Sequence, residues 1–261
     1  MPRCMLRLVH AEKLVDAALE LAAAGLQATE ISRRLRVPKS TVQYWCRGGR
    51  RLPRASELCM PCPRCHGAPL ADAPYSYLLG TYLGDGHITT PSPTTAVLAI
   101  YCADDWPGVS AETERAMRAV MPHSNVSRAA RTGCHALRSS SRHWLCLFPQ
   151  HGPGMKHARS IVLQPWQQVI VDDHPGQLLR GLFHSDGCRN VNWTQKRTEA
   201  GLVRYEYPRY LFSNKSEDIR AICEAALDSL DIAHRRPRRD LVSVARRASV
   251  ALLDELVGPK Y

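Results

Sequence analysis

Two aspartates stand in matching surroundings in this chain. Asp85 ends the apolar stretch LLGTYLGDG (78–86), and Asp186 ends the stretch LRGLFHSDG (179–187). Carboxylate oxygens are the ligands that hard divalent cations such as Mg²⁺ prefer. A carboxylate in the last turn of a helix lies against the negative end of the helix dipole, which is unfavourable unless a cation binds there. We therefore expect both aspartates to bind metal, although an Asp-Gly pair can also simply end a helix.

Small residues recur at a spacing of four in both stretches. Gly80 and Gly84 occur in the first stretch, and Gly181 and Ser185 occur in the second. An interior glycine weakens a helix by about 1 kcal/mol relative to alanine, so two of them need a reason. A stripe of small residues on one helix face lets another backbone approach closely. We expect the two helices to pack through these residues, with Gly86 in the left-handed conformation that ends a helix.

The composition favours a globular protein with a polyanionic partner. Of the 261 residues, 44% are hydrophobic, and the formal net charge is +11. Such a positive charge suits nucleic acid, although it also fits a generally basic protein. The sequence contains no apolar run long enough for a membrane span, and its ten cysteines are interpreted as thiols or metal ligands. We expect a cytoplasmic, nucleoid-associated protein.

Residues 10–48 show the pattern of three short helices. The turn Val37-Pro38-Lys39 separates the last two, and Ser40 is expected to cap the third helix. This pattern resembles the helix-turn-helix of resolvases and many regulators, whose helix after the turn enters the DNA major groove. A plain helical hairpin is the alternative. The resemblance implies DNA contacts by Lys39, Ser40, Thr41, Gln43 and Tyr44, and phosphate contacts by Arg47, Arg50 and Arg51 in the linker that follows.

The sequence CMPCPRCHG suggests a zinc knuckle. Its candidate ligands are Cys59, Cys62, Cys65 and His66, because two cysteines separated by two residues present two thiolates to one Zn²⁺. Alternatively, Cys62 and Cys65 pair with a more distant ligand such as Cys46 or Cys59, or all of these thiols are unliganded. Further along, Cys146, His151 and His157 have a spacing that permits a second metal, but ordinary solvated histidines are the simpler interpretation.

The two glycine-rich stretches resemble the LAGLIDADG motif of homing endonucleases, in the single-chain form with two motifs. Each stretch is followed by patterns typical of two strands, a helix, two strands and a helix. The resemblance implies an α+β fold of two pseudo-symmetric αββαββα halves, whose sheets form a saddle over DNA. We expect a helix-turn-helix domain at 1–50, a linker with the zinc knuckle at 51–73, a first half at 74–150, an extended linker at 151–175 and a second half at 176–261.

The resemblance also implies a chemistry. The family binds divalent metal with one acidic residue from each motif helix, here Asp85 and Asp186, with Mg²⁺ or Mn²⁺ as the cofactor. Polar residues near the cleft assist, and the candidates are Gln195, Lys196 and Lys215. A positively charged saddle would use arginines after each central helix, above all Arg235, Arg236, Arg238 and Arg239, with Arg128, Arg131, Arg138, Arg142, Arg246 and Arg247. Since one chain carries both motifs, we expect a monomer.

Two functions remain open. One is a metal-dependent endonuclease that cleaves double-stranded DNA and carries its own helix-turn-helix. The other is a non-cleaving, DNA-binding transcription regulator built on the same fold, an interpretation that the added helix-turn-helix favours. The chain departs from the family at Leu83-Gly84 and His184-Ser185, just before the aspartates, and it shows no intein splice signals. We therefore expect a free-standing protein. Both aspartates are present, which favours the nuclease.

Overall fold

The computed structural model describes residues 3–47, 62–92, 95–199 and 201–260. It divides into two compact units, Met1–Met60 and Pro61–Tyr261. Each unit has a hydrophobic core of its own. Among the described residues, no helix combines the length and the apolar character that crossing a membrane requires.

The described residues of the first unit form the helices α1 (Arg3–Ala23), α2 (Ala28–Leu35) and α3 (Lys39–Cys46). Each helix contributes one fully buried side chain to the core, namely Ala18, Ile31 and Val42. Arg36 ends α2 in the left-handed conformation, with φ 53°, and turns the chain toward α3. The structure therefore has the three helices that the sequence predicts, although α1 is longer than expected.

The start of α3 differs from the prediction. Ser40 was expected to be the N-cap, but α3 begins at Lys39 and Pro38 occupies the N-cap position. The carbonyl oxygen of Pro38 accepts the N–H groups of Thr41 and Val42 at 2.9 and 3.1 Å. The φ of Pro38, −52°, is fixed by its ring and requires no rearrangement to begin the helix. Ser40 therefore lies inside the first turn of α3, where its side chain is exposed.

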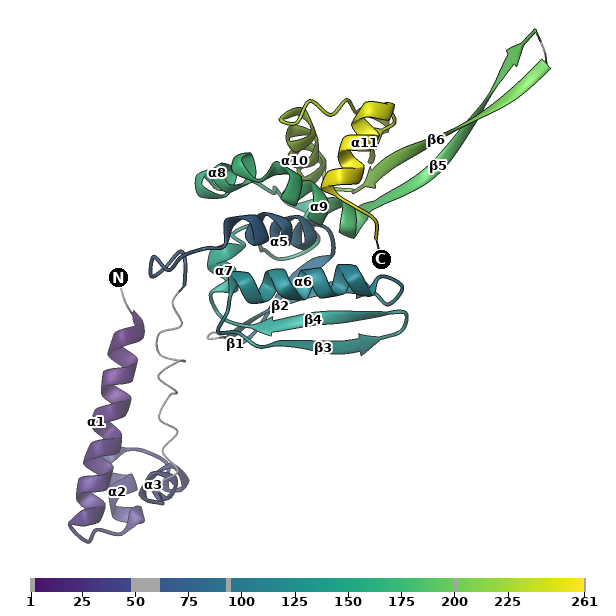
Figure 1. Ribbon diagram of the computed structural model, residues 1–261. Helices are drawn as coiled ribbons and strands as arrows, with labels where there is room; N and C mark the ends of the chain where they lie inside the picture. The colour runs from purple at the N-terminus through teal and green to yellow at the C-terminus, as the bar shows by residue number, and fades with distance from the viewer. Residues whose placement is uncertain (1–2, 48–61, 93–94, 200, 261) are drawn as a thin grey trace. The chain divides into compact units, whose positions relative to one another are not determined.

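The second unit consists of two halves with the same order of elements (Figure 1). The first half contains α5 (Asp72–Asp85), β1 (Gly86–Ser92), β2 (Thr95–Ala103), α6 (Pro107–Val120), β3 (Val126–Arg131), β4 (Cys134–Ser140) and α7 (Trp144–Leu147). The second half contains α9 (Pro175–Asp186), β5 (Gly187–Thr198), β6 (Gly201–Ser213), α10 (Glu217–Asp228), β7 (Arg235–Arg238), β8 (Leu241–Val244) and α11 (Arg247–Leu256). Each half forms a four-stranded antiparallel sheet, in the orders β1-β2-β4-β3 and β5-β6-β8-β7.

One face of each sheet packs against helices, and the other face carries exposed side chains such as Arg138. Directly paired residues of antiparallel strands share a face. In the first sheet Ile100 pairs with Leu137, and both side chains are buried beneath the helices. Arg138 is the next residue along β4, so its exposed side chain lies on the opposite face. In the second sheet Phe212 pairs with Val242 on the buried face.

The segment between the halves is not the extended linker that the sequence predicts. It contains a short 3₁₀ helix, η1 (Lys156–Ala158), and an α-helix, α8 (Pro165–Asp173). Gln164 and Gln167 form a capping box at the start of α8, and Pro165 occupies the first turn, where proline is tolerated. Pro165 therefore begins a helix instead of preventing one.

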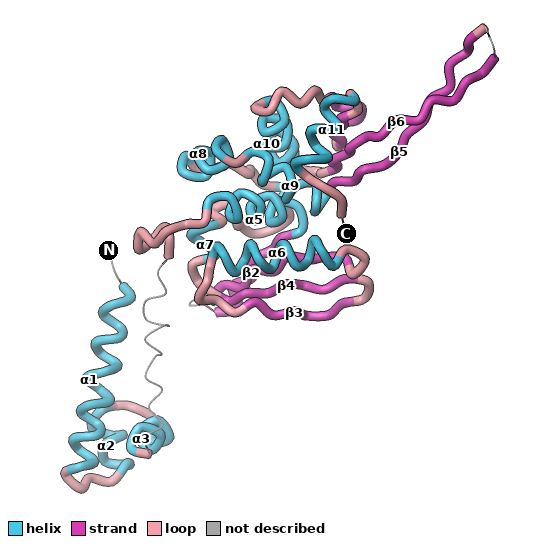
Figure 2. Tube along the Cα trace, viewed as in Figure 1, coloured by secondary structure: helices cyan, strands magenta, loops and turns pink. Residues whose placement is uncertain are grey.

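The β5–β6 hairpin is much longer than the rest of its sheet. β5 has 12 residues and β6 has 13, but β8 pairs only with Tyr210–Ser213. The outer part of the hairpin is therefore a two-stranded ribbon that extends beyond the helices (Figure 2). Val191, Trp193 and Leu202 are exposed on this ribbon.

Candidate functional site: the paired aspartates between the halves

The two helices that end in aspartate, α5 and α9, pack through their small residues. A Cβ placed on Gly181 would lie 2.1 Å from a backbone carbonyl oxygen of α5, and one on Gly80 would lie 2.5 Å from a carbonyl oxygen of α9. A Cβ on Gly84 would lie 2.1 Å from the Oγ of Ser185. Real Cβ atoms do not occur at such distances, so glycine is what lets the two backbones approach. The four small residues named from the sequence lie at this contact.

Each helix passes directly into a strand at its final glycine. Gly86 has φ −85° and Gly187 has φ −99°, both in the extended region. The expectation of a left-handed Gly86 is therefore wrong. Glycine is needed here for space, since a Cβ on Gly86 would lie 2.4 Å from the Cα of Tyr82, and a Cβ on Gly187 would lie 2.6 Å from the Cα of Phe183. The sharp exit places each aspartate at the last helical position beside the other helix.

Asp85 and Asp186, at the ends of α5 and α9, lie close enough for the Asp186 carboxylate to influence the ionisation of Asp85. Burial and the neighbouring Asp186 carboxylate raise the pKa of Asp85 to about 6. Burial also raises the pKa of Asp186, although the side-chain amide of Asn214 opposes this by donating a hydrogen bond of 2.6 Å to Asp186 Oδ2. Two neighbouring carboxylates are difficult to ionise at the same time, so a bound cation would stabilise the ionised pair.

Two lysines lie beside the aspartate pair, one from the segment between the halves and one from the residues after α11. Lys156 Nζ donates to the carbonyl oxygens of Leu83 and Gly84, at 3.1 and 2.9 Å, in the last turn of α5. Lys260 Nζ donates to the carbonyl oxygen of Gly187, at 2.6 Å, where α9 ends. Burial lowers the pKa of Lys156 to about 8 and also lowers that of Lys260, while the aspartates act in the opposite direction.

Neither lysine is predicted from the sequence. Both follow the last helix of a half, yet they belong to segments without periodicity or a motif. Their matching places after α7 and α11 are the signal that could have identified them.

A cavity flanks each side of the aspartate pair. The first is lined by Asp85, Cys102, Ser185 and Lys260, among others. The second is lined by Gly84, Lys156, Asp186, Asn214 and Lys215, among others. The residues present fit a divalent metal, because carboxylate oxygens at the negative ends of two helices are hard, anionic donors beside open space. Lys215, named from the sequence, therefore lies near Asp186.

No family model matches the sequence, and a search of curated proteins finds no match. Solved structures of similar shape include the homing endonuclease I-DmoI in complex with DNA and Mn, with 13% identity over 73% of this chain and 99% of that chain, at a TM-score of 0.48. The meganuclease I-AabMI bound to uncleaved DNA has 10% identity over 70% of this chain and 82% of that chain, at a TM-score of 0.44. Full-length WhiA from Thermotoga maritima has 16% identity over 73% of this chain and 57% of that chain, at a TM-score of 0.43.

The topology of the chain itself decides the fold. Two αββαββα halves each form a four-stranded antiparallel sheet, and their first helices pack glycine against glycine with an aspartate at each end. The chain has the LAGLIDADG fold. This LAGLIDADG unit spans the residues from α5 to α11, and the three-helix unit precedes it in sequence.

Gln195 and Lys196 do not approach the aspartates of the LAGLIDADG unit. Both lie near the end of β5, in the ribbon that extends beyond the sheet. At a rise of about 3.3 Å per residue, they are roughly 30 Å along the strand from Asp186. The prediction that they act at the metal site is therefore wrong, because a strand pattern in sequence does not reveal how far the hairpin extends.

The arginines of the LAGLIDADG sheets divide between two faces. Arg236 faces α10, where its guanidinium forms ion pairs with Glu217 and Glu224. Arg128 in the first half likewise faces α6 and pairs with Glu114 at 2.9 Å. These two arginines connect the edge strands to helices, so they do not lie on the faces away from the helices. Arg235, Arg238 and Arg239 are exposed, and Arg131 and Arg138 lie on the face away from the helices.

The helix-turn-helix residues named from the sequence mostly lie on the surface of α3. The side chains of Lys39, Ser40, Tyr44 and Arg47 are exposed, whereas Thr41 and Gln43 are half-buried. Val42 faces the core instead. Arg50 and Arg51 lie outside the described residues.

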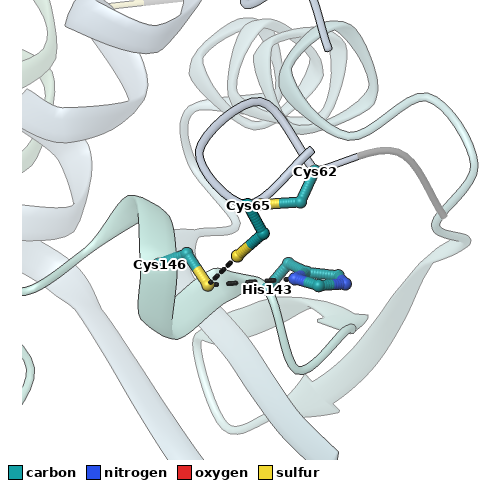
Figure 3. Close-up of side chains that lie close together, drawn as sticks. All are labelled: Cys62, Cys65, His143 and Cys146. Carbon is teal, nitrogen blue, oxygen red and sulfur yellow. Dashed lines mark hydrogen bonds between the residues drawn. The ribbon is translucent and has the colours of Figure 1, made fainter. Parts of the chain in front are cut away.

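The structure brings together a different set of zinc-ligand side chains from the one named from the sequence. Cys62 and Cys65 lie beside His143 and Cys146 (Figure 3). His66 is not part of this group, and its Nδ1 accepts the backbone N–H of Cys62 at 3.0 Å. Cys59 lies outside the described residues, and Cys46 ends α3 in the first unit. The remaining histidines named from the sequence lie elsewhere: His151 against His87, and His157 at the cavity beside Asp186.

One further hydrogen-bonded chain has the residue types of a hydrolase triad. Ser110 Oγ lies 2.6 Å from His135 Nε2, and His135 Nδ1 lies 2.8 Å from Asp104 Oδ1. Ser110 is fully buried between α6 and the sheet, so a substrate carbonyl cannot reach its hydroxyl. This chain therefore connects α6 to β4 and is not a catalytic site.

Proposed function

We propose that the chain is a sequence-specific DNA endonuclease that hydrolyses phosphodiester bonds with divalent metal ions held by Asp85 and Asp186. The observation that supports this most strongly is the placement of the two aspartates, which end the two helices of one glycine-lined contact and flank open cavities. Structural braces seldom leave two carboxylates beside each other with raised pKa values, whereas catalytic sites often do.

Double-stranded DNA is the proposed partner. The net charge of +11 favours a polyanion, and basic side chains are exposed on the first sheet, at Arg138, and on the β5–β6 ribbon, at Lys196. The exposed residues at the start of α3 suit base and phosphate contacts in a major groove. A single chain contributes both aspartates, so the proposed nuclease needs no second copy to complete its site.

Each side chain of the site has a distinct part in the proposed reaction. Asp85 and Asp186 would hold Mg²⁺ or Mn²⁺ through their carboxylate oxygens, while Asn214 fixes the orientation of Asp186. When bound, the metal lowers the pKa of the attacking water and offsets the negative charge that develops on the phosphate. Lys156 and Lys260 each lie at one of the two cavities, where their fixed positive charge would stabilise negative charge in the transition state.

Cleavage of a randomised duplex library tests this proposal. The wild-type chain with Mg²⁺ or Mn²⁺ should produce defined ends, and Asp85→Asn and Asp186→Asn should each lower the cleavage rate by at least about 10²-fold. Both variants should keep DNA affinity, because asparagine retains the shape and removes only a charge. Asp172→Asn is the matched control, since Asp172 lies exposed on α8 away from the site.

The binding assay separates the two functions. If the wild-type chain enriches a DNA sequence without cutting it under any divalent metal, the nuclease proposal fails and a non-cleaving transcription regulator takes its place. If either substitution abolishes folding, as judged by circular dichroism, the carboxylates are structural.

A further inference from the structure

Four side chains of metal-ligand type converge from two segments that are far apart in sequence (Figure 3). Cys62 and Cys65 precede α5, whereas His143 and Cys146 lie at α7. Their ligand atoms all lie within 4.8 Å of one another. The sulfur atoms of Cys65 and Cys146 are 3.2 Å apart, and Cys146 Sγ is 3.8 Å from His143 Nδ1. Ligand atoms at these separations can all reach one Zn²⁺, for which the metal–nitrogen distance is about 2.0 Å and the metal–sulfur distance about 2.3 Å.

The turn that carries Cys62 and Cys65 is organised around the sulfur of Cys62. The backbone N–H groups of Arg64 and Cys65 both hydrogen-bond to that sulfur. The backbone N–H of His66 donates to the carbonyl oxygen of Cys62 at 2.9 Å, which closes the turn. Such outer contacts orient a ligand before metal arrives. His66 therefore shapes the turn, and its ring also contacts the edge of His143 at a centroid distance of 5.4 Å.

We propose that Cys62, Cys65, His143 and Cys146 bind one structural Zn²⁺. Three sulfurs and one imidazole nitrogen form a soft donor set that selects Zn²⁺ over the hard cations suited to Asp85 and Asp186. Four protein ligands complete a tetrahedron, so the ion has no open position for water or substrate. Each pair of ligands is separated by two residues in sequence, the spacing that lets one turn present two donors to the same ion.

A disulfide does not account for the cluster. The Cys65–Cys146 sulfur separation of 3.2 Å is well above the bond length of about 2.05 Å. Both residues are free thiols. A disulfide would also leave Cys62 and His143 without a role, although both side chains are buried and point into the cluster.

The ion would fasten the start of the LAGLIDADG unit to its first half. Residues 62–71 contain turns and irregular backbone but no helix or strand. Besides the turn itself, the guanidinium of Arg64 lies 4.3 Å from the ring of Trp166 on α8. Leu70 also packs against the core, and Zn²⁺ at α7 would add a covalent attachment to these contacts. This segment follows the helix-turn-helix in sequence, so the zinc site would set where that connection enters the nuclease fold.

Metal analysis of the full chain tests the proposal. The protein purified under a thiol reductant and passed through a desalting column should contain about one Zn²⁺ per chain by mass spectrometry of the elements. Cys65→Ser and Cys146→Ser should each reduce the zinc content to a small fraction of the wild-type value. Cys134→Ser and Cys59→Ser should retain it, the first because Cys134 lies outside the cluster on β4, the second because Cys59 is absent from the proposed ligand set.

A second measurement covers variants that fail to fold. The zinc-free wild-type chain, prepared with a chelator, should take up Co²⁺ and develop the visible absorption of tetrahedral cobalt with thiolate ligands. Mass spectrometry of the denatured, metal-free chain should show the mass of the fully reduced sequence, without the loss of two hydrogens that a disulfide causes, and the native chain should be heavier by one metal ion less the thiol protons that the metal displaces. A reduced wild-type chain that neither contains Zn²⁺ nor binds Zn²⁺ or Co²⁺ overturns the proposal. Loss of zinc in Cys59→Ser but not in Cys146→Ser overturns the ligand set.

Discussion

Alanine at position 181 should force α5 and α9 apart. The added Cβ would lie 2.1 Å from a carbonyl oxygen of α5 and 2.9 Å from a backbone nitrogen of the same helix, and neither atom can rotate away. Alanine favours an isolated helix over glycine by about 1 kcal/mol, but overpacking against a rigid backbone costs about 1–3 kcal/mol and sometimes more. Relief of the overlap requires a separation of roughly 1 Å, since a close-packed interior offers no free space. We therefore expect Gly181→Ala to destabilise the second unit by about 2 kcal/mol.

The matched control is Gly176→Ala in the same helix. A Cβ there would lie 2.9 Å from the end of the Leu256 side chain, which can rotate. Differential scanning fluorimetry should show a Tm lower by about 4–8 °C for Gly181→Ala and a nearly unchanged Tm for Gly176→Ala. Because Asp85 and Asp186 end the two displaced helices, cleavage by Gly181→Ala should also fall, on the order of 10²-fold for a shift of about 1 Å. Equal Tm values for the two variants would refute the close contact, and a lower Tm with full cleavage would refute its link to the aspartates.

Further outcomes follow from the charges near the site. The cleavage rate should rise as pH increases through about 6, where Asp85 loses its proton, and should fall above about 8, where Lys156 loses its proton. The rise near pH 6 should move to lower pH at higher metal concentration. The fold raises the pKa of Asp85 from an ordinary value of 3.8 to about 6, so the folded state binds a proton more tightly than the unfolded state. The free energy of unfolding of the metal-free protein should therefore fall as pH rises from about 4 to 6, by on the order of 1 kcal/mol after screening by water. Urea unfolding of Asp85→Asn should not show this loss. Arg138→Ala should weaken DNA binding and reduce the slope of log affinity against log salt by about 1, whereas Arg128→Ala, whose guanidinium is held by α6, should leave that slope unchanged. If both arginine variants changed the salt slope equally, the strand register would not identify the face that binds DNA.

The sequence predicts the central helix contact because its cause is local. Gly80, Gly84 and Gly181 lower the helix propensity of their own segments, and only a close backbone neighbour compensates for that loss. The aspartates follow from the same local pattern. The left-handed Gly86 is a wrong prediction because two different needs select glycine at a helix end, left-handed φ and absence of a Cβ, and sequence does not distinguish them.

The parts of the site that the sequence did not reveal depend on tertiary contacts. His143 and Cys146 meet Cys62 only because α7 returns to the start of the unit, so the ligands nearest in sequence were named instead. The face of each sheet that an arginine occupies depends on strand register, and a shift of one residue reverses it. The sequence therefore predicts a DNA contact for Arg236, whereas its side chain forms an ion pair with Glu224 on α10.

The two halves have the same order of elements, but the side chains around their aspartates differ. Asp186 receives a hydrogen bond from Asn214, whereas Asp85 has its pKa raised by burial and by Asp186 itself. Lys156 donates to three carbonyl oxygens at the end of α5, and Lys260 donates to two at the end of α9, so each lysine neutralises the helix end on which an aspartate lies. Without metal, this positive charge permits the pair to fold together. Asp85, the aspartate with the weaker support, should therefore be the one whose protonation limits metal binding.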